Sequence, residues 1–206
     1  MYEVMRAAMK VLLPLIMRLR IVGREHFPAE PPYILAMNHL SIFDAPVLLI
    51  TCPHTIRALA ADKHKRNPIY CPLLVIMRAI WVRRGEPDRE ALRQALGVLK
   101  QKGVLGIAPE GTRSHEKHAL QQGKVGVAYL ATRADVPIVP IGIAGTEQVK
   151  RNVLRLRRTD VQVVVGKPQR LPSAGRVRSA QLEEYTELIM QRLAALLPEE
   201  YRGVYA

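Results

Sequence analysis

A histidine and an aspartate five residues apart are the pair in this chain whose types and spacing could do chemistry. His39 and Asp44 lie in the segment NHLSIFD, residues 38–44. The apolar residues 33–37 before it are typical of a buried strand, and the apolar residues 45–50 after it are typical of the start of a helix. One turn between strand and helix can bring the carboxylate onto the imidazole. A carboxylate on one ring nitrogen fixes the tautomer and leaves the other nitrogen free to take a proton, so the pair predicts a general base.

The elements that must position this pair alternate along a chain of 206 residues, which is long enough for one domain with a sizeable core. Patterns of apolar residues predict strands over residues 19–22, 33–37, 55–61, 79–82, 104–108, 138–143 and 161–165. They predict helices at the N-terminus, after residue 44, and over residues 69–77, 88–103, 125–134 and 181–197. The alternation predicts a single-domain α/β fold, in which helices flank a mostly parallel central sheet.

Polar clusters follow three of the expected strands, where ligands gather in open α/β sheets. The first is His39 with Asp44, the second is RRG at residues 83–85, and the third is PEGTRS at residues 109–114. An arginine fork can bind two phosphate oxygens, and glycine lets backbone N–H groups approach them. No residues have metal-ligand spacing, and the two cysteines, Cys52 and Cys71, are expected to be reduced thiols of a cytoplasmic protein. These features point to a hydroxyl nucleophile on a phosphorylated substrate.

The charge balance indicates an anionic partner. Lys and Arg number 31 against 18 Asp and Glu, which gives a formal net charge of +13. Such a balance suits nucleic acid, an acidic membrane surface or a phosphorylated substrate. Aromatic residues make up only 5%, which argues against the stacking platforms of single-strand nucleic-acid binding. A basic nucleic-acid-binding protein therefore stays a rival from another class, although no recognition-helix motif supports it.

The first 18 residues form an amphipathic pattern, and we treat residues 1–18 as a membrane-interface helix preceding a catalytic domain over residues 19–206. Read as a helix, the pattern gathers a polar stripe on one side, made up of Glu3, Arg6, Lys10, Pro14 and Arg18. The alternative is an ordinary core-facing helix. The apolar run is too short to span a bilayer, which takes ~20 residues. Residues 150–158 hold five basic side chains in nine positions, which suits either a solvated loop or a contact with anionic lipid.

Four blocks in this order resemble the glycerophospholipid acyltransferases of the 1-acyl-glycerol-3-phosphate acyltransferase type. They are the N-H-x4-D segment, the arginine pair after residue 82, PEGTRS, and VPIVPI at residues 136–141. The resemblance covers roughly residues 18–170. It implies that His39 is the general base, that Asp44 orients it, and that Pro140 belongs to a block near the acyl donor. It also implies an acceptor-phosphate pocket built from Arg84, Glu110, Gly111, Thr112 and Arg113.

The sequence departs from the family pattern at two places. An acidic residue often precedes the arginine of the second block, but Arg83 stands there, so either Arg83 or Arg84 could hold the phosphate. A lysine often precedes Gly123, but Gln121 and Gln122 stand there. Read alone, His39 could be a structural hydrogen-bond partner and Asp44 a helix cap. Ser41 lacks the G-x-S-x-G elbow of a nucleophile and is predicted to be a helix cap. The histidines at positions 54, 64, 115 and 118 are predicted to lie at the surface.

The resemblance implies an enzyme, an O-acyltransferase of phospholipid biosynthesis. It would move a fatty acyl group from acyl-CoA or acyl-carrier protein to the sn-2 hydroxyl of 1-acyl-glycerol-3-phosphate, forming phosphatidic acid. The thioester is a co-substrate, and no cofactor, metal or nucleic acid is expected. The expected location is the cytoplasmic face of the cell membrane, as a peripheral or monotopic protein. Other acceptors stay open, namely glycerol-3-phosphate, another lysophospholipid or a lyso-aminolipid, and so does thioester hydrolysis by the same pair.

Overall fold

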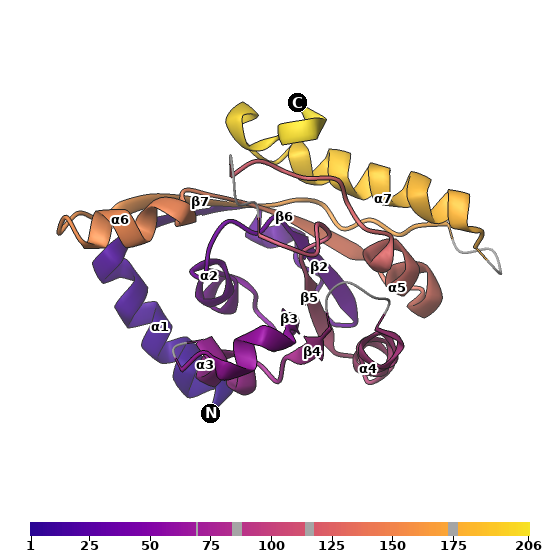
Figure 1. Cartoon of the computed structure of the whole chain (residues 1–206), viewed down its shortest axis with the longest axis horizontal. Helices are drawn as coiled ribbons and strands as arrows, with labels where there is room; N and C mark the ends of the chain where they lie inside the picture. Colours follow the sequence, from indigo (N-terminus) through magenta and orange to yellow (C-terminus); the bar gives the residue numbers. More distant parts are fainter. Residues whose placement is uncertain (69, 84–87, 114–117, 173–176) are drawn as a thin grey trace.

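The computed structural model describes residues 1–68, 70–83, 88–113, 118–172 and 177–206. Within these ranges the strands form one seven-stranded sheet in the order β1-β7-β6-β2-β5-β3-β4 (Figure 1). Their bounds are β1 Met17–Val22, β2 Tyr33–Met37, β3 Ile56–Ala61, β4 Ile80–Val82, β5 Val104–Ile107, β6 Ile138–Ala144 and β7 Thr159–Val165. The expected α/β fold with a mostly parallel sheet is confirmed.

Five neighbouring strands, β2 to β6, run in one direction, so their carboxyl ends meet at one edge of the sheet. β7 pairs with β6 in the antiparallel direction, and β1 pairs with β7 in parallel. The last two strands of the sheet therefore run opposite to the other five. Every polar cluster expected from the sequence follows a strand of the parallel group.

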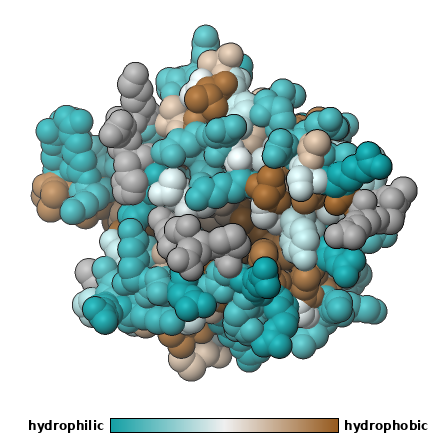
Figure 2. Space-filling model, turned by 45° about the vertical axis from the view of Figure 1, so that its right-hand side comes forward, coloured by the Kyte–Doolittle hydropathy of each residue, from teal (hydrophilic) through white to brown (hydrophobic). Residues whose placement is uncertain are grey.

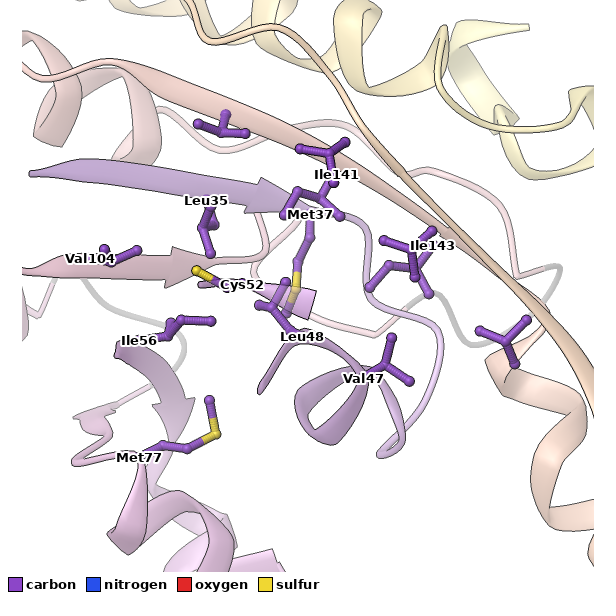
Figure 3. Close-up of a cluster of buried hydrophobic side chains, with 14 of the residues drawn as sticks. Leu35, Met37, Val47, Leu48, Cys52, Ile56, Met77, Val104, Ile141 and Ile143 are labelled. Carbon is purple, nitrogen blue, oxygen red and sulfur yellow. The ribbon is translucent and has the colours of Figure 1, made fainter. Parts of the chain in front are cut away.

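Helices cover both faces of the sheet (Figure 1). Their bounds are α1 Tyr2–Ile16, α2 Asp44–Thr51, α3 Tyr70–Ile76, α4 Arg89–Lys100, α5 Gly126–Ala134, α6 Val149–Val153 and α7 Ser179–Ala194. One apolar core joins the sheet to α1 and α2, and a second joins the opposite face to α4, α5 and α7. Figure 3 shows the first core, where Leu35 and Met37 of β2 and Ile141 of β6 lie over Val47 and Leu48 of α2.

α1 packs against the protein with one face and leaves another face exposed. Leu13 is buried, whereas Val4, Val11, Leu12 and Leu15 are exposed. None of the described helices is long and apolar enough to cross a membrane. The helix thus contributes to the core and still presents an apolar surface.

The polar stripe expected along α1 does not form one exposed side. Arg6 turns toward the protein, where its guanidinium donates to the carbonyl oxygens of Leu49, Pro53 and His54 at 3.1, 3.2 and 2.8 Å. Carbonyls near a helix C-terminus lack partners within the helix, and a cation there also suits the helix dipole. Arg18 lies within β1 and forms an ion pair with the exposed Asp160. The expected boundary at residue 18 therefore falls inside a strand.

The molecular surface is mainly hydrophilic on the face drawn in Figure 2. Apolar side chains on that face are visible in a central hollow and as smaller groups among hydrophilic ones. Exposed apolar residues on the molecule as a whole include four on α1 and two leucines after α6, at positions 154 and 156.

Candidate active site

Asn38 fixes the turn that follows β2. Its side chain is buried, donates through Nδ2 to the carbonyl of Ile143 at 2.8 Å, and accepts from the Ile143 amide at 2.8 Å. An asparagine side chain carries one acceptor and one donor group, so it can satisfy both backbone groups of a neighbouring strand. The turn carrying His39 is thereby tied to β6.

His39 and Asp44 form the pair that their spacing predicts. The Nδ1 atom of His39 lies 2.6 Å from Oδ2 of Asp44. The Asp44 side chain is fully buried, whereas that of His39 is 25% exposed and lines a cavity. Because the carboxylate accepts at Nδ1, the proton belongs on Nδ1 and Nε2 keeps its lone pair. Within the described part of the chain no hydrogen bond engages Nε2, so this atom can accept a proton from a molecule in the cavity.

Asp44 is held by four hydrogen-bond donors. Besides His39, the amides of Leu40 and Ser41 donate to Oδ2 at 2.7 and 2.8 Å. The hydroxyl of Thr146 donates to the other oxygen, Oδ1. Burial of a carboxylate is costly unless hydrogen bonds replace its water, and these donors do so. Asp44 is thus fixed as the acceptor for His39.

Thr146 is a site residue that the sequence interpretation missed. It is fully buried and lies two residues after the end of β6, in the 3-10 turn Thr146–Gln148. Its carbonyl oxygen also accepts from the Ser41 hydroxyl at 3.0 Å. Its position after the fourth block was the available signal, because residues after parallel strands gather at one edge. The turn after β2 and the turn after β6 therefore hold each other.

Three smaller expectations need correction. Ser41 does not cap α2, which begins at Asp44; its hydroxyl accepts from the Phe43 amide at 3.1 Å within the preceding turn. His54 is half-buried rather than at the surface, with Nδ1 2.8 Å from the Tyr33 hydroxyl. His64 is also half-buried and lines the cavity. Position 118 is exposed as expected, and position 115 lies outside the described residues.

The third block forms the loop after β5. Glu110 is buried and does not line the cavity; its Oε2 accepts from the Gln121 amide at 3.0 Å. Gly111 adopts a φ of +69°, which favours glycine. Gly111, Thr112 and Arg113 line the cavity. Glu110 thus holds the returning loop, while the next three residues face the cavity.

Lys124 is the second residue that the sequence interpretation missed. A Cβ atom on Gly111 would lie 3.1 Å from both Cδ and Nζ of Lys124, so this side chain crosses directly over the glycine. The Lys124 amide donates to the carbonyl of Pro109 at 2.9 Å, which anchors it to the same loop. The lysine that often precedes Gly123 in the family is absent from this chain. Lys124, which follows Gly123, lines the same cavity as Gly111, Thr112 and Arg113 of the third block.

The cavity beside His39 has a volume of about 570 Å³ and is lined by both cationic and apolar residues. Cationic side chains from three segments line it, namely Arg83, Arg113 and Lys124. The remaining lining is largely apolar and includes Met37, Ile42, Leu59, Leu73, Leu74, Val82, Leu92, Ile107, Val127 and Leu130. A molecule with an anionic head and an apolar tail fits such a cavity.

The cations at the cavity differ in their partners. The Arg83 side chain lies 3.7 Å from Asp88, which also accepts the Arg83 amide at 2.9 Å. That backbone hydrogen bond, followed by one from Ala91, lowers the pKa of Asp88. None of the ion pairs in the described residues includes Arg113 or Lys124. Arg84, the expected phosphate ligand of the second block, lies outside the described residues.

The fold and this site define an acyltransferase: the model of the Acyltransferase family matches residues 18–144, and the chain belongs to that family. It is 25% identical over 198 residues to 1-acyl-sn-glycerol-3-phosphate acyltransferase of Bacillus subtilis (strain 168), covering 95% of this chain and 96% of that protein. It is 28% identical over 188 residues to the alpha enzyme of the same name from Bos taurus, covering 83% of this chain and 64% of the bovine protein.

A solved structure has the same fold. The crystal structure of the 1-acyl-sn-glycerophosphate (LPA) acyltransferase PlsC from Thermotoga maritima superposes with a TM-score of 0.72. The sequences are 22% identical, and the match covers 95% of this chain and 78% of the other. The arrangement of the sheet and its flanking helices is therefore shared well beyond the sequence blocks.

Proposed function

We propose that this protein transfers a fatty acyl group from an acyl thioester to the sn-2 hydroxyl of 1-acyl-glycerol-3-phosphate, forming phosphatidic acid. The observation that carries the proposal is the position of His39, whose open Nε2 faces a cavity with both cationic and apolar walls. For the His39–Asp44 pair to act as a general base, the acceptor must place a hydroxyl near Nε2 of His39. The names of the Bacillus and bovine relatives support lysophosphatidate as that acceptor.

The proposed chemistry is direct transfer without an acyl-enzyme. Nε2 of His39 takes the proton of the acceptor hydroxyl as its oxygen attacks the thioester carbonyl. The new C–O ester bond forms, the C–S bond breaks, and the proton passes from His39 to the departing thiolate. Asp44 keeps the ring in the right tautomer and stabilises the imidazolium that forms between the two proton transfers.

The acceptor phosphate is proposed to bind where the cations line the cavity. Arg113 supplies a two-pronged guanidinium, and Lys124 supplies a point charge over Gly111. Thr112 adds a hydroxyl from the same loop. Glu110 is proposed to support the pocket without lining it, because its carboxylate accepts from the Gln121 amide and so holds the loop. Arg84 is proposed as a further ligand on sequence grounds, with Arg83 as its alternative.

The apolar wall is proposed to take a fatty acyl chain. Each buried methylene contributes about 0.8 kcal/mol, so a long chain binds strongly to such a lining. Either acyl-CoA or acyl-carrier protein can supply the thioester, since both offer the same carbonyl. The proposal requires no cofactor and no metal, because the bond formed and the bond broken need only a base and a proton donor.

Substrate and product both carry acyl chains, so the protein is proposed to work at an anionic membrane surface, as a peripheral or monotopic protein on the cytoplasmic face. The exposed apolar residues of α1, Val4, Val11, Leu12 and Leu15, supply one contact. The net charge of +13 supplies attraction to anionic lipid.

The test is an acyl-transfer assay read by mass spectrometry, with acyl-CoA and acyl-carrier protein as separate donors. The acceptors are lysophosphatidate, glycerol-3-phosphate, another lysophospholipid, a lyso-aminolipid and water alone. We expect phosphatidate to form fastest, and His39→Ala to abolish it. Free fatty acid as the sole product would make the protein a thioester hydrolase. Faster acylation of another acceptor would make that molecule, and not lysophosphatidate, the substrate. In a separate assay, sedimentation with DNA rather than with anionic liposomes would favour the nucleic-acid alternative.

A further inference from the structure

The turn that follows α6 holds two leucines out of the protein. Leu154 is 79% exposed and Leu156 is 97% exposed, the highest exposure of any large apolar side chain in the described residues. Single exposed apolar residues are normal on protein surfaces. Two leucines in three positions, flanked by cations, form an organised feature. We name residues 150–158, which comprise most of α6 and the turn after it, the arginine–leucine turn.

Backbone hydrogen bonds fix the shape of this turn. The amides of Arg155 and Arg157 both donate to the carbonyl of Asn152 at 2.9 Å, and the Leu156 amide donates to Val153 at 3.0 Å. The Asn152 side chain donates to the Thr159 hydroxyl at 3.0 Å, which ties the turn to β7. The leucines are therefore presented by a fixed scaffold.

Leu156 occupies a backbone conformation that its side chain disfavours. Its φ is +54°, in the left-handed region where glycine and asparagine are the usual residues. The Leu156 side chain gains almost no contact with the protein in return, because it is nearly fully exposed. Neither backbone preference nor packing explains a leucine here, which points to a partner outside the chain.

Cations surround the two leucines. Lys150, Arg151, Arg155, Arg157 and Arg158 are all exposed, and residues 150–158 include no acidic residue. Apolar side chains flanked by arginines match a surface that has an anionic layer outside and an apolar layer beneath. An aqueous anion would match the arginines but leave the leucines without a partner.

The turn lies beside the carboxyl-terminal end of α1. Met17, which follows α1, is in register with Thr159, which follows the turn, and the Arg158 guanidinium donates to the Met17 carbonyl at 3.4 Å. Figure 1 accordingly shows α6 next to the carboxyl-terminal end of α1, where Leu12 and Leu15 are exposed. Two segments far apart in sequence thus present apolar side chains at one edge of the molecule.

We infer that the arginine–leucine turn inserts Leu154 and Leu156 below the headgroups of an anionic membrane while its arginines bind the lipid phosphates. The inference rests on the proposed function only in requiring a membrane as the working surface. It adds a second insertion point to α1 and explains both the exposed leucines and the cations. A second copy of this chain is a poorer partner, because a two-fold contact through this turn would set its cations against one another.

The test compares Leu154→Ser/Leu156→Ser with the native chain in sedimentation with vesicles of phosphatidylcholine containing phosphatidylglycerol. We expect binding to weaken about tenfold, because two leucines lose burial in the bilayer. The matched control is Val204→Ser, which removes an exposed apolar side chain in the C-terminal turn Gly203–Tyr205. It should bind like the native chain. Equal binding by the double variant and the native chain overturns the inference.

A spectroscopic variant tests insertion directly. Leu156→Trp should show a blue shift and quenching by brominated lipid when anionic vesicles are added, beyond the signal of the native Trp81. The absence of a blue shift and of quenching would overturn the inference. Leucine variants that alter the oligomeric state but not vesicle binding would also overturn it. Activity on detergent-dispersed substrate separates the two proposals. The Leu154→Ser/Leu156→Ser variant should keep its activity on such substrate. If the native chain inserts this turn into vesicles but transfers no acyl group, only the proposed function is refuted.

Discussion

Thr146 donates its hydroxyl hydrogen bond to Asp44 across 102 positions of sequence, and the same carboxylate accepts from His39. The bond joins the turn after β6 to the first residue of α2. Both oxygens of the buried Asp44 side chain are thus engaged by hydrogen-bond donors. The orientation of the imidazole therefore depends on a strand far from it in sequence.

Replacement of Thr146 by valine keeps the shape of the side chain and removes the donor. We expect Thr146→Val to lower kcat about tenfold with little change in KM, because Oδ1 of Asp44 is left buried without its donor. The unfolding free energy should fall by about 1–3 kcal/mol for the same reason. Thr146→Ser restores the hydroxyl and is the matched control. Indistinguishable kcat values for the two variants would remove Thr146 from the support of the pair.

The general base is tested by His39→Ala and Asp44→Asn. We expect His39→Ala to reduce kcat by about 10²- to 10⁴-fold, since a hydroxyl is a weak nucleophile without proton removal. Asp44→Asn should cost nearly as much, because an amide group can favour the wrong tautomer. Circular dichroism and the melting temperature check the fold. A folded His39→Ala protein that keeps most of its activity would rule out the mechanism.

The guanidinium of Arg113 is expected to bind the acceptor phosphate through two hydrogen bonds. Arg113→Lys keeps the charge but loses the fork, so kcat/KM for lysophosphatidate should fall by about tenfold or more. A neutral monoacylglycerol, tested as acceptor with the same donor, should be affected little. Equal losses on the two acceptors would place Arg113 outside the phosphate site.

Lys124 is expected to act on the same phosphate as a point charge. Lys124→Gln should raise KM for lysophosphatidate several-fold, with a smaller effect on kcat, and the loss should shrink at high salt. Lys167→Gln is the matched control, because Lys167 is exposed after β7, whose carboxyl end lies at the opposite edge of the sheet. A Lys124 variant that behaves like the control would leave the phosphate to arginines alone.

The two faces of α1 predict two different phenotypes. Leu13→Ala should destabilise the protein by about 2–5 kcal/mol in denaturant unfolding, because this leucine is buried. Val11→Ser/Leu15→Ser changes exposed residues, so it should leave stability almost unchanged and weaken sedimentation with liposomes. Complete deletion of residues 1–18 removes both faces and part of β1, so its effect on vesicle binding would be confounded with unfolding. Unchanged liposome binding by the double variant would make α1 a core helix only.

Local features of the sequence predicted a large part of this protein. The alternation of strand and helix patterns predicted the α/β fold, and the spacing of His39 and Asp44 predicted their hydrogen bond, because five residues across one turn leave few geometries. The helix predicted over residues 88–103 begins as α4 at Arg89, where the Asp88 side chain caps it by accepting from the Ala91 amide at 3.1 Å. In each case the partners lie within a few residues, so spacing and backbone geometry decide the contact.

Contacts between distant segments depended on the tertiary structure. Only the order of strands brings Thr146 to Asp44 and the turn after β2 to Ile143. The packing of α1 decides that Arg6 faces the protein, although its spacing placed it on a polar stripe with Lys10. The loop after β5 brings Lys124 across Gly111, a position that no spacing rule predicts. Sequence periodicity says which side chains share a face of one element, whereas the identity of the neighbour across that face is decided by how the whole chain packs.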